Sequence, residues 1–268
     1  MIDYSPCKIN LGLNVIRKRS DGYHDLETLF YEVSGRPDII ELQPSAEDSF
    51  SSSGIIVDCP AESNLCCRAL RLLRDSGYLV PPTSIHLHKQ IPFGAGLGGG
   101  SANATYVLRM ANTLYSLGIS VEELEVLSGA LGSDTSFFVR GGAQLGFSRG
   151  EVLEPVDFSL AGYHLYIVMP DLHISTALAF SGIKPCVPRF SIRDILSRDF
   201  SFWRSHLVND FEGSLFPVYE RLAQIKQTFY SQGAVYASMS GSGASVYGIF
   251  EKPVDFAFED LWHYEVMR

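Results

Sequence analysis

Apolar and polar residues alternate with period two along residues 4–16, and this period predicts a β-strand. One face of the predicted strand carries the apolar side chains Ile9, Leu11, Leu13 and Val15. The other face carries a lysine, a glycine and two asparagines: Lys8, Asn10, Gly12 and Asn14. A polar series at this spacing lines a surface rather than a core. From spacing alone it favours a strand face exposed to solvent.

A polar hairpin turn follows at residues 17–22, with an Asp-Gly pair as the turn signal. A second strand-like run covers residues 23–30, so Tyr23 and His24 stand at the rim of the same predicted sheet. An aromatic ring and an imidazole at a rim can stack on a heterocycle and form hydrogen bonds with it. In the alternative interpretation, Tyr23 packs over the hairpin and His24 faces water.

Further elements follow from the same kinds of pattern. Strands are predicted at 38–42, 55–58, 84–89 and 163–169, with a Ser- and Asp-rich surface loop at 44–53. Helical spacing of apolar residues predicts helices from 64 to about 73, from 101 to about 117, from 120 to about 130 and from 209 to 222. A new strand after Pro155 predicts two domains, residues 1–157 and 158–268.

The most distinctive stretch has five glycines in the seven positions 94–100, between a predicted strand and a predicted helix. Glycine permits positive φ and lets a ligand lie against the backbone. A helix that starts where the glycines end directs free N–H groups and its positive dipole end at the loop, and a phosphate fits this site best. A flexible glycine turn without a ligand is the alternative.

Two common nucleotide loops fit this stretch poorly. A Walker A loop requires a lysine directly after the glycines, and none is present. A dinucleotide fingerprint can be placed on Gly94, Gly96 and Gly99, but that loop should leave a buried apolar strand directly. Here Pro92 interrupts, and the preceding strand alternates polar and apolar residues. A third form remains, with proline at the entrance and Gly-Gly-Gly-Ser at the exit.

Composition limits the class of protein. The 268 residues, 46% hydrophobic and 19% charged, are typical of a globular protein with one large domain or two smaller ones. The net charge of −9 argues against nucleic acid or an anionic membrane as a partner. No apolar stretch reaches the roughly 18 residues of a membrane span. Five cysteines without an export signal indicate reduced thiols, all buried or half-buried, in a cytoplasmic protein.

Two further groups of side chains are candidates for chemistry. Asp134 lies between small residues, just before an apolar run that predicts a strand. By residue type alone, a structural role as a helix cap or turn aspartate explains it as well as a catalytic role does. His86 and His88 share one strand face and could bind a metal. Because no third ligand is apparent, we expect a partly exposed strand face there.

The stretch from the loop's proline to Ala102 resembles the phosphate loop of the GHMP kinases, which include galactokinase, homoserine kinase and mevalonate kinase. The resemblance implies the α+β, two-domain GHMP kinase fold, with an N-terminal ATP-binding domain like domain 2 of ribosomal protein S5 and a ferredoxin-like C-terminal domain. It also implies ATP and Mg²⁺ as cofactors, with Ser101 near Mg²⁺. The implied ATP-binding residues are Pro92, Phe93, Gly94, Ala95, Gly96, Leu97, Gly98, Gly99, Gly100, Ser101, Ala102 and Asn64.

Three other segments narrow the resemblance to one branch of this family. Pro6-Cys7-Lys8-Ile9-Asn10-Leu11 and Asp21-Gly22-Tyr23-His24 are similar to motifs of members that phosphorylate a cytidine diphosphate-linked methylerythritol, with Cys7 in place of the usual alanine. Leu131-Gly132-Ser133-Asp134 resembles the motif of the catalytic aspartate. The resemblance implies that Asp134 accepts the proton of the substrate hydroxyl and that Lys8 lies beside it. The implied substrate-binding residues are Asn10, Tyr23, His24, Thr176 and Phe180; for Phe180, a core position is the alternative.

The expected partners are this small-molecule substrate and ATP, with no nucleic acid and no membrane, and the chain is expected to be a monomer or a weak homodimer. Two alternatives remain open: another small-molecule kinase of the family, or a non-catalytic ligand-binding member. Tyr23, His24 and Phe180 argue against the first, because other GHMP kinases need no wall that stacks a base. The joint presence of Lys8, Asp134 and the loop serine argues against the second.

Overall fold

The computed structural model describes residues 1–57, 59–255, 258 and 261–267. The chain forms two compact units, and each combines segments that are separated in the sequence. Unit 1 contains Met1–Lys8, Glu32–Phe93 and Gly98–Gly141, and unit 2 contains Ile9–Tyr31, Gly94–Leu97 and Gly142–Arg268. Strands β1 (Ile2–Lys18) and β2 (His24–Pro44) contribute residues to both units. The single boundary after residue 157 stays a prediction.

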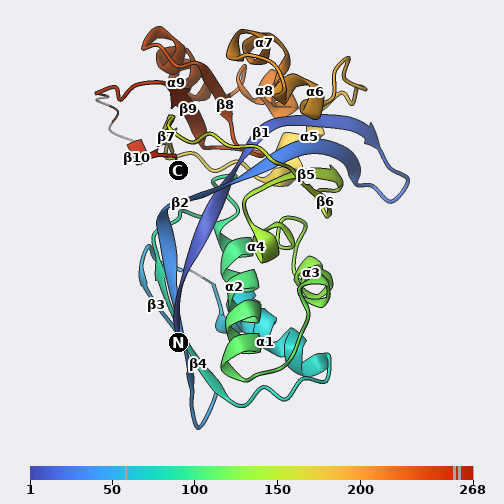
Figure 1. Ribbon diagram of the computed structural model, residues 1–268, viewed down its shortest axis with the longest axis vertical. Helices are drawn as coiled ribbons and strands as arrows, with labels where there is room; N and C mark the ends of the chain where they lie inside the picture. The colour runs from blue at the N-terminus through green and yellow to red at the C-terminus, as the bar shows by residue number, and fades with distance from the viewer. Residues whose placement is uncertain (58, 256–257, 259–260, 268) are drawn as a thin grey trace. The chain divides into compact units, whose positions relative to one another are not determined.

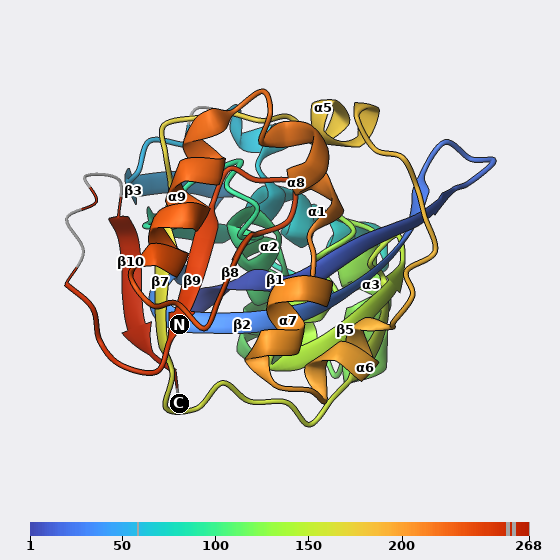
Figure 2. The ribbon, with the colours of Figure 1, turned by 90° about the horizontal axis from the view of Figure 1, so that it is seen from above.

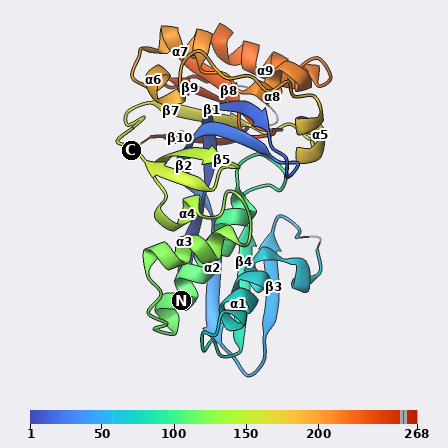
Figure 3. The same ribbon diagram turned by 90° about the vertical axis from the view of Figure 1, so that its right-hand side faces the viewer.

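Unit 1 consists of a sheet with helices packed on it (Figure 1, Figure 3). Besides parts of β1 and β2, it contains β3 (Ser49–Gly54), η1 (Ala61–Ser63), α1 (Leu65–Asp75), β4 (Thr83–Lys89), α2 (Gly99–Leu114), α3 (Val121–Gly129) and α4 (Phe137–Arg140). The second half of β2 pairs antiparallel with β4, and β4 pairs in parallel with the edge strand β3. The glycine stretch therefore leads from a strand of this sheet to one of its helices.

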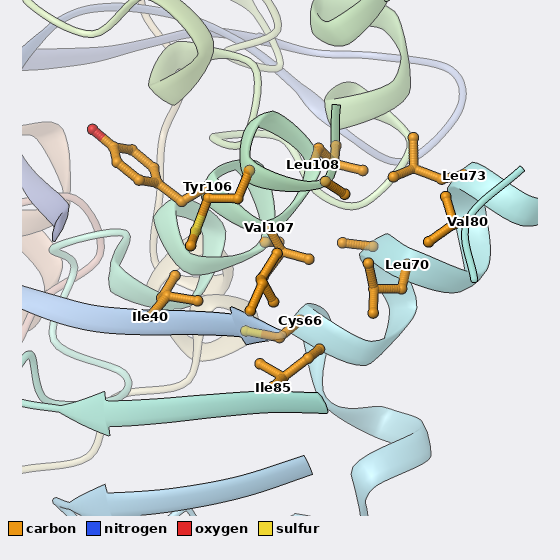
Figure 4. Close-up of a cluster of buried hydrophobic side chains, with 14 of the residues drawn as sticks. Ile40, Cys66, Leu70, Leu73, Val80, Ile85, Tyr106, Val107 and Leu108 are labelled. Carbon is orange, nitrogen blue, oxygen red and sulfur yellow. The ribbon is translucent and has the colours of Figure 1, made fainter. Parts of the chain in front are cut away.

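The core of unit 1 lies between this sheet and helices α1 and α2 (Figure 4). Ile40 of β2 and Ile85 of β4 point into it and are at most 1% exposed. Cys66, Leu70 and Leu73 recur at spacings of four and three, which place them on one face of α1. Most of the stability of a short helix comes from burying such a face, so this cluster holds α1 and α2 against the sheet.

Unit 2 contains two groups of paired strands (Figure 2). Its further elements are β5 (Ala143–Ser148), β6 (Val152–Pro155), β7 (His164–Val168), α5 (Thr176–Ser181), α6 (Ile192–Leu196), α7 (Phe200–His206), α8 (Asp210–Leu215), α9 (Glu220–Ser231), β8 (Tyr236–Met239), β9 (Val246–Phe250) and β10 (Leu261–Val266). The first half of β2 pairs with β5, and β5 pairs with β6. A second, antiparallel sheet has the order β10-β7-β9-β8, and α8 and α9 pack on it through Phe211, Leu222 and Phe229.

Most of the predicted elements are present. The strand predicted at 84–89 is β4, and the three predicted helices of unit 1 are α1, α2 and α3. The hairpin turn has the expected geometry, since Gly22 has a φ of +86° and its N–H donates to the Arg19 carbonyl oxygen at 3.2 Å. The mixed helices and sheets confirm the α+β class.

Several predicted elements are corrected. From His24 onward, the runs predicted at 23–30 and 38–42 belong to one continuous strand, β2, and the predicted loop 44–53 overlaps β3. The serines of β3 pair through their backbone, which composition does not reveal. Residues 55–57 form no strand, and residue 58 of that prediction lies outside the described residues. The apolar run after Asp134 forms the short helix α4 instead of a strand, and the helix predicted over 209–222 is divided into α8 and α9.

The cysteines are free thiols in the structure, and three of them are buried or half-buried as predicted: Cys7, Cys66 and Cys67. Cys59 and Cys186 are exposed, so the prediction is wrong for these two. Burial raises the pKa of the Cys66 thiol to about 12, because the charged thiolate is disfavoured away from water. Cys66 therefore acts as a small core side chain.

Candidate active site

Helix α2 of unit 1 begins inside the glycine stretch, ahead of the start predicted at Ser101. Gly98 is its N-cap, with a φ of +69° that glycine adopts without strain. The N–H groups of Gly99, Gly100 and Ser101 belong to the first turn and have no acceptor within the helix. Together with the positive end of the helix dipole, they form a site suited to phosphate.

Close packing requires two of these glycines. A Cβ atom on Gly98 would lie 3.1 Å from the Phe138 ring and 3.2 Å from the Lys8 side chain. A Cβ atom on Gly99 would lie 2.7 Å from the Ile91 side chain, closer than real Cβ atoms come to a neighbour. Glycine at both positions therefore lets the start of α2 approach Lys8 and the residues before the loop.

Lys8 and Asp134 form an ion pair within unit 1, with Lys8 Nζ 3.3 Å from Asp134 Oδ2. The Lys8 side chain is 3% exposed and the Asp134 side chain is 33% exposed, so a ligand can reach the carboxylate from solvent. Lys8, Asn10 and Asn14 are all buried, so the solvent-exposed face favoured for this strand is wrong. Tertiary packing covers both faces of β1 between residues 5 and 15.

Thr135 fixes the turn that carries Asp134. Its fully buried hydroxyl lies 2.5 Å from the Ser128 carbonyl oxygen and 2.6 Å from the Gly132 carbonyl oxygen. Its own carbonyl oxygen accepts a hydrogen bond of 2.8 Å from the Thr105 hydroxyl of α2. These contacts tie the aspartate to both α2 and α3. The roles of Thr135 and Thr105 were not predicted from the sequence. The position of Thr135 directly after Asp134 was the only local signal, and Thr105 had none.

Ser101 lies near the same turn. Its hydroxyl is 4.0 Å from the position that a Cβ atom on Gly132 would take. Mg²⁺ prefers oxygen ligands and is usually held by one or two protein oxygens together with substrate phosphates, so this hydroxyl fits an ion that arrives with a nucleotide. Among the described residues, no group of three His, Cys, Asp or Glu side chains could hold a metal.

The other nucleotide-binding residues predicted in unit 1 have different environments. Asn64 caps α1, since its Oδ1 accepts a hydrogen bond of 2.9 Å from the Cys66 N–H, and it is 8% exposed. Phe93, next to Pro92, is 50% exposed, whereas Ala102 is buried in α2. Asn64 therefore has a structural role as a helix cap, and its contact with a nucleotide stays a prediction.

Residues 94–97 of the glycine stretch belong to unit 2, where they pack on the serine-rich loop after β8. The Ser240 hydroxyl donates to the Gly96 carbonyl oxygen at 2.9 Å, and the Ser245 N–H donates to the Ala95 carbonyl oxygen at 3.2 Å. A Cβ atom on Gly96 would overlap the Ser240 carbonyl oxygen. The serine-rich loop therefore supports the first half of the glycine stretch.

His24 and Phe180 stack on each other in unit 2, with ring centroids 4.8 Å apart and an interplanar angle of 18°. Phe180 also meets Phe211 edge-on at 4.9 Å, so it packs against the core and contacts a ring of the hairpin. Burial lowers the pKa of His24, and the positive charge of Lys18 lowers it further. His24 is therefore half-buried against Phe180 and not surrounded by water alone.

The remaining substrate-binding residues predicted from the sequence divide into two groups. Tyr23 is 55% exposed, with the Arg149 guanidinium carbon 5.0 Å from its ring centroid, and Thr176 is exposed at the start of α5. Asn10 is 2% exposed, and its side-chain amide donates to the Thr28 hydroxyl at 2.9 Å. Tyr23 and Thr176 therefore present their side chains to solvent, whereas Asn10 is engaged inside unit 2.

His86 and His88 lie on a partly exposed face of β4, as predicted. Their ring nitrogens are 2.9 to 3.0 Å from the hydroxyls of Ser51 and Ser53 on β3. The histidine pair therefore has serine partners across the strand pair.

Comparison with protein families identifies both halves of the chain. Residues 64–142 match the GHMP kinases N terminal domain, and residues 191–261 match the GHMP kinases C terminal domain. The chain is 46% identical over 262 residues to 4-diphosphocytidyl-2-C-methyl-D-erythritol kinase of Parabacteroides distasonis. The aligned region covers 98% of this chain and 96% of the relative. The chain is 44% identical over 255 residues to the Bacteroides thetaiotaomicron protein of the same name, covering 94% and 92%.

Solved structures agree with this assignment. A crystal structure of 4-(cytidine 5'-diphospho)-2C-methyl-D-erythritol kinase matches with a TM-score of 0.79 at 31% identity, covering 94% of this chain and 91% of that one. A mevalonate kinase crystal structure matches with a TM-score of 0.69 at 13% identity, over 93% of this chain and 91% of that one, and shares the fold.

The two domain matches and the fold define the class as GHMP kinases, which use ATP as a substrate. With 46% identity over nearly its full length, the chain belongs within this class to the family of the 4-diphosphocytidyl-2-C-methyl-D-erythritol kinases. The resemblance seen in the sequence is confirmed. None of the described helices is long and apolar enough to span a membrane.

Proposed function

We propose that this chain transfers the γ-phosphoryl group of ATP to the 2-hydroxyl of 4-diphosphocytidyl-2-C-methyl-D-erythritol, giving the 2-phosphate and ADP in the non-mevalonate route to isoprenoid precursors. The observation that carries the proposal is the Lys8–Asp134 pair, 3.3 Å apart, in the unit that also holds the start of α2. The 46% identity to a relative with this name supports the substrate.

Phosphoryl transfer needs an aligned hydroxyl and neutralised phosphate charge more than covalent help from the protein. In the proposed step, the 2-hydroxyl oxygen forms a bond to the γ-phosphorus, and the bond between that phosphorus and the bridging oxygen of ADP breaks. The hydroxyl proton passes to the Asp134 carboxylate. Lys8, on the buried side of Asp134, orients the carboxylate and donates a hydrogen bond to the reacting hydroxyl or a γ-phosphate oxygen.

The start of α2 provides the phosphate contacts in this proposal. The N–H groups of Gly99, Gly100 and Ser101 bind phosphate oxygens without carrying a full charge. Ser101 would hold the Mg²⁺ that accompanies ATP, and this ion would neutralise negative charge on the phosphates. The chain is acidic overall, with a net charge of −9, so such local dipoles and cations are needed to hold a polyanion.

The cytosine of the substrate is assigned to the hairpin of unit 2. His24 and Phe180 are already stacked, and Tyr23 presents a largely exposed ring with Arg149 beside it. Aromatic faces bind a nucleobase by stacking, and the imidazole adds a hydrogen-bonding group. These residues would distinguish a cytidylyl substrate from mevalonate or homoserine, which have no base.

Phe180→Ala is expected to raise KM for the cytidylyl substrate by roughly five- to a hundredfold, the usual range for losing a base-stacking ring. KM for ATP should change little, because the rings that Phe180 contacts are those of His24 and Phe211, whereas the phosphate contacts are assigned to the start of α2. Phe190→Ala is the matched control, since that ring packs edge-on against Phe202 in the same unit. Steady-state kinetics with each substrate varied separately gives both constants, and an unchanged KM for the cytidylyl substrate would exclude the stacking role.

KM for the cytidylyl substrate is expected to rise as the pH falls below 6.5, the ordinary pKa of a histidine side chain. Burial lowers the pKa of His24, and a bound base would bury the ring further, so protonation opposes binding. The effect should be absent above pH 6.5, where the ring is neutral with or without substrate. KM measured from pH 5 to pH 8 should lose this dependence in His24→Asn, and a dependence that persists in the variant would contradict the assignment.

One assay tests the proposed function as a whole. ATP consumption is measured with the purified chain, Mg²⁺ and 4-diphosphocytidyl-2-C-methyl-D-erythritol, beside mevalonate, homoserine and galactose. Turnover with the cytidylyl substrate alone is the expected result. Turnover with one of the other alcohols would keep the phosphate site and Asp134 but overturn the assignment of the cytosine residues. ATP binding without turnover would favour a non-catalytic member of the family.

A further inference from the structure

Unit 1 contains a buried ion pair that the proposed mechanism does not use. Lys89 at the end of β4 contacts Asp38 of β2, and both side chains are 0% exposed. Removing two charges from water is costly, and an apolar pair of similar volume is often at least as stable. The pair therefore calls for an explanation beyond stability, and its remaining contacts provide one.

The Asp38 carboxylate holds the backbone that enters the glycine stretch. Its Oδ1 atom accepts hydrogen bonds from the Gln90 N–H at 2.6 Å and the Ile91 N–H at 2.8 Å. Its Oδ2 atom accepts from Lys89 Nζ and, at 2.9 Å, from the Asn103 side-chain amide. One carboxylate thus contacts the two residues that precede the loop proline and a residue in the second turn of α2.

Lys89 holds the other end of the stretch. Its ammonium donates to Asn103 Oδ1 at 3.1 Å and lies 3.1 Å from the position of a Cβ atom on Gly99, the first residue of α2. It is also 5.1 Å from the ring centroid of Phe93, directly before the stretch. A lone cation next to a helix N-terminus is unfavourable, and Asp38 offsets that charge. The ammonium therefore lies beside Gly99, where the N–H groups assigned to phosphate begin.

We infer that Asp38 and Lys89 are positioning residues for nucleotide binding. They clamp the residues before the glycine stretch to the first two turns of α2, and so set the direction of the N–H groups of Gly99 to Ser101. An apolar pair could fill the same volume, but it could not accept two backbone N–H groups and bridge to Asn103. The inference rests on the proposed function, because it assigns the loop to the phosphates of ATP.

Two single variants and a double variant test the clamp. Lys89→Met removes the ammonium and keeps the apolar stem, but it leaves a buried carboxylate without its cation. The double variant Lys89→Met/Asp38→Asn removes both charges, so it avoids the large destabilisation caused by an unpaired buried charge. Asn103→Ala keeps the ion pair and removes its link to α2. Neither the double variant nor Asn103→Ala leaves an unpaired buried charge, so both can be compared with the parent as folded proteins.

Lys226→Met is the matched control. Lys226 of α9 pairs with Glu212, 2.5 Å away, and Glu212 also accepts a hydrogen bond of 2.8 Å from the Met239 N–H. This second carboxylate thus holds a lysine and a backbone N–H in a similar way, within unit 2. Lys226→Met should lower the stability of the protein as loss of an ion pair does. It should not weaken MgATP binding, because its ion pair does not contact the glycine stretch or α2.

The measurements are the Kd of MgATP by titration calorimetry, KM for the cytidylyl substrate and the unfolding temperature. We expect Lys89→Met, the double variant and Asn103→Ala to weaken MgATP binding by roughly ten- to hundredfold, as for other small misplacements of binding groups, with KM for the cytidylyl substrate within about twofold of the parent. Lys226→Met should lower the unfolding temperature and leave Kd unchanged.

Folded double and Asn103→Ala variants that bind MgATP as tightly as the parent would overturn the inference, as would an equal loss of affinity in Lys226→Met. A parent protein that does not bind MgATP would instead contradict the proposed function. The two failures are therefore distinguishable.

Discussion

Asp134→Asn is expected to lower kcat by roughly 10²- to 10⁴-fold, the usual contribution of a positioned general base. Asparagine has nearly the same shape and can still form hydrogen bonds, but it cannot take the hydroxyl proton at this position. The turn should keep its conformation, because the buried Thr135 hydroxyl and the Thr105 contact hold it. MgATP affinity should be largely retained, since the phosphate contacts come from the start of α2.

The measurement is ADP release at saturating concentrations of both substrates, with the Kd of MgATP measured separately by calorimetry. Asp75→Asn is the control, because Asp75 is an exposed carboxylate at the end of α1 in the same unit. It should turn over like the parent. A normal kcat in Asp134→Asn would remove the aspartate from the mechanism. Loss of MgATP binding together with turnover would assign it to nucleotide binding instead.

Lys8→Met is expected to lower kcat by roughly 10²- to 10³-fold, the range seen when one preorganised donor to developing charge is removed. Methionine fills the space of the lysine stem, which is 3% exposed and lies against Gly98. The fold should tolerate the change, because the Asp134 carboxylate left behind is 33% exposed and can be solvated. Lys8→Ala should also abolish most turnover, with a larger loss of stability from the cavity.

Lys184→Met, which changes an exposed lysine of unit 2, is the control for loss of a positive charge. The double variant of Lys8 and Asp134 gives a sharper test. If the two side chains act in one step, the double variant should lose about as much activity as the more impaired single variant. Fully multiplied losses would show that they contribute independently, and a parent-like kcat in Lys8→Met would exclude its role.

The sequence alone determined the features that depend on consecutive residues. The glycines at 94–100 permit a backbone that bends through positive φ, and Gly94, Gly96 and Gly98 adopt it directly before a helix. The hairpin turn and the apolar face of α1 followed from local chemistry and from helical spacing. The family motifs around Lys8 and Asp134 are also continuous in sequence, so the sequence identifies both residues although their 3.3 Å contact depends on the fold.

Only the tertiary structure decided what covers each face and which distant residues meet. Period two placed Lys8 and Asn10 together on a strand face, but burial of that face depends on segments far along the chain. The serines of β3 had no strand signal, because backbone pairing with β4 holds them in place. The clamp of Asp38 and Lys89 joins residues 51 positions apart in the chain. Periodicity is a property of one segment, whereas burial and ion pairing are properties of two segments in contact, so the chain had to be folded before these could be known.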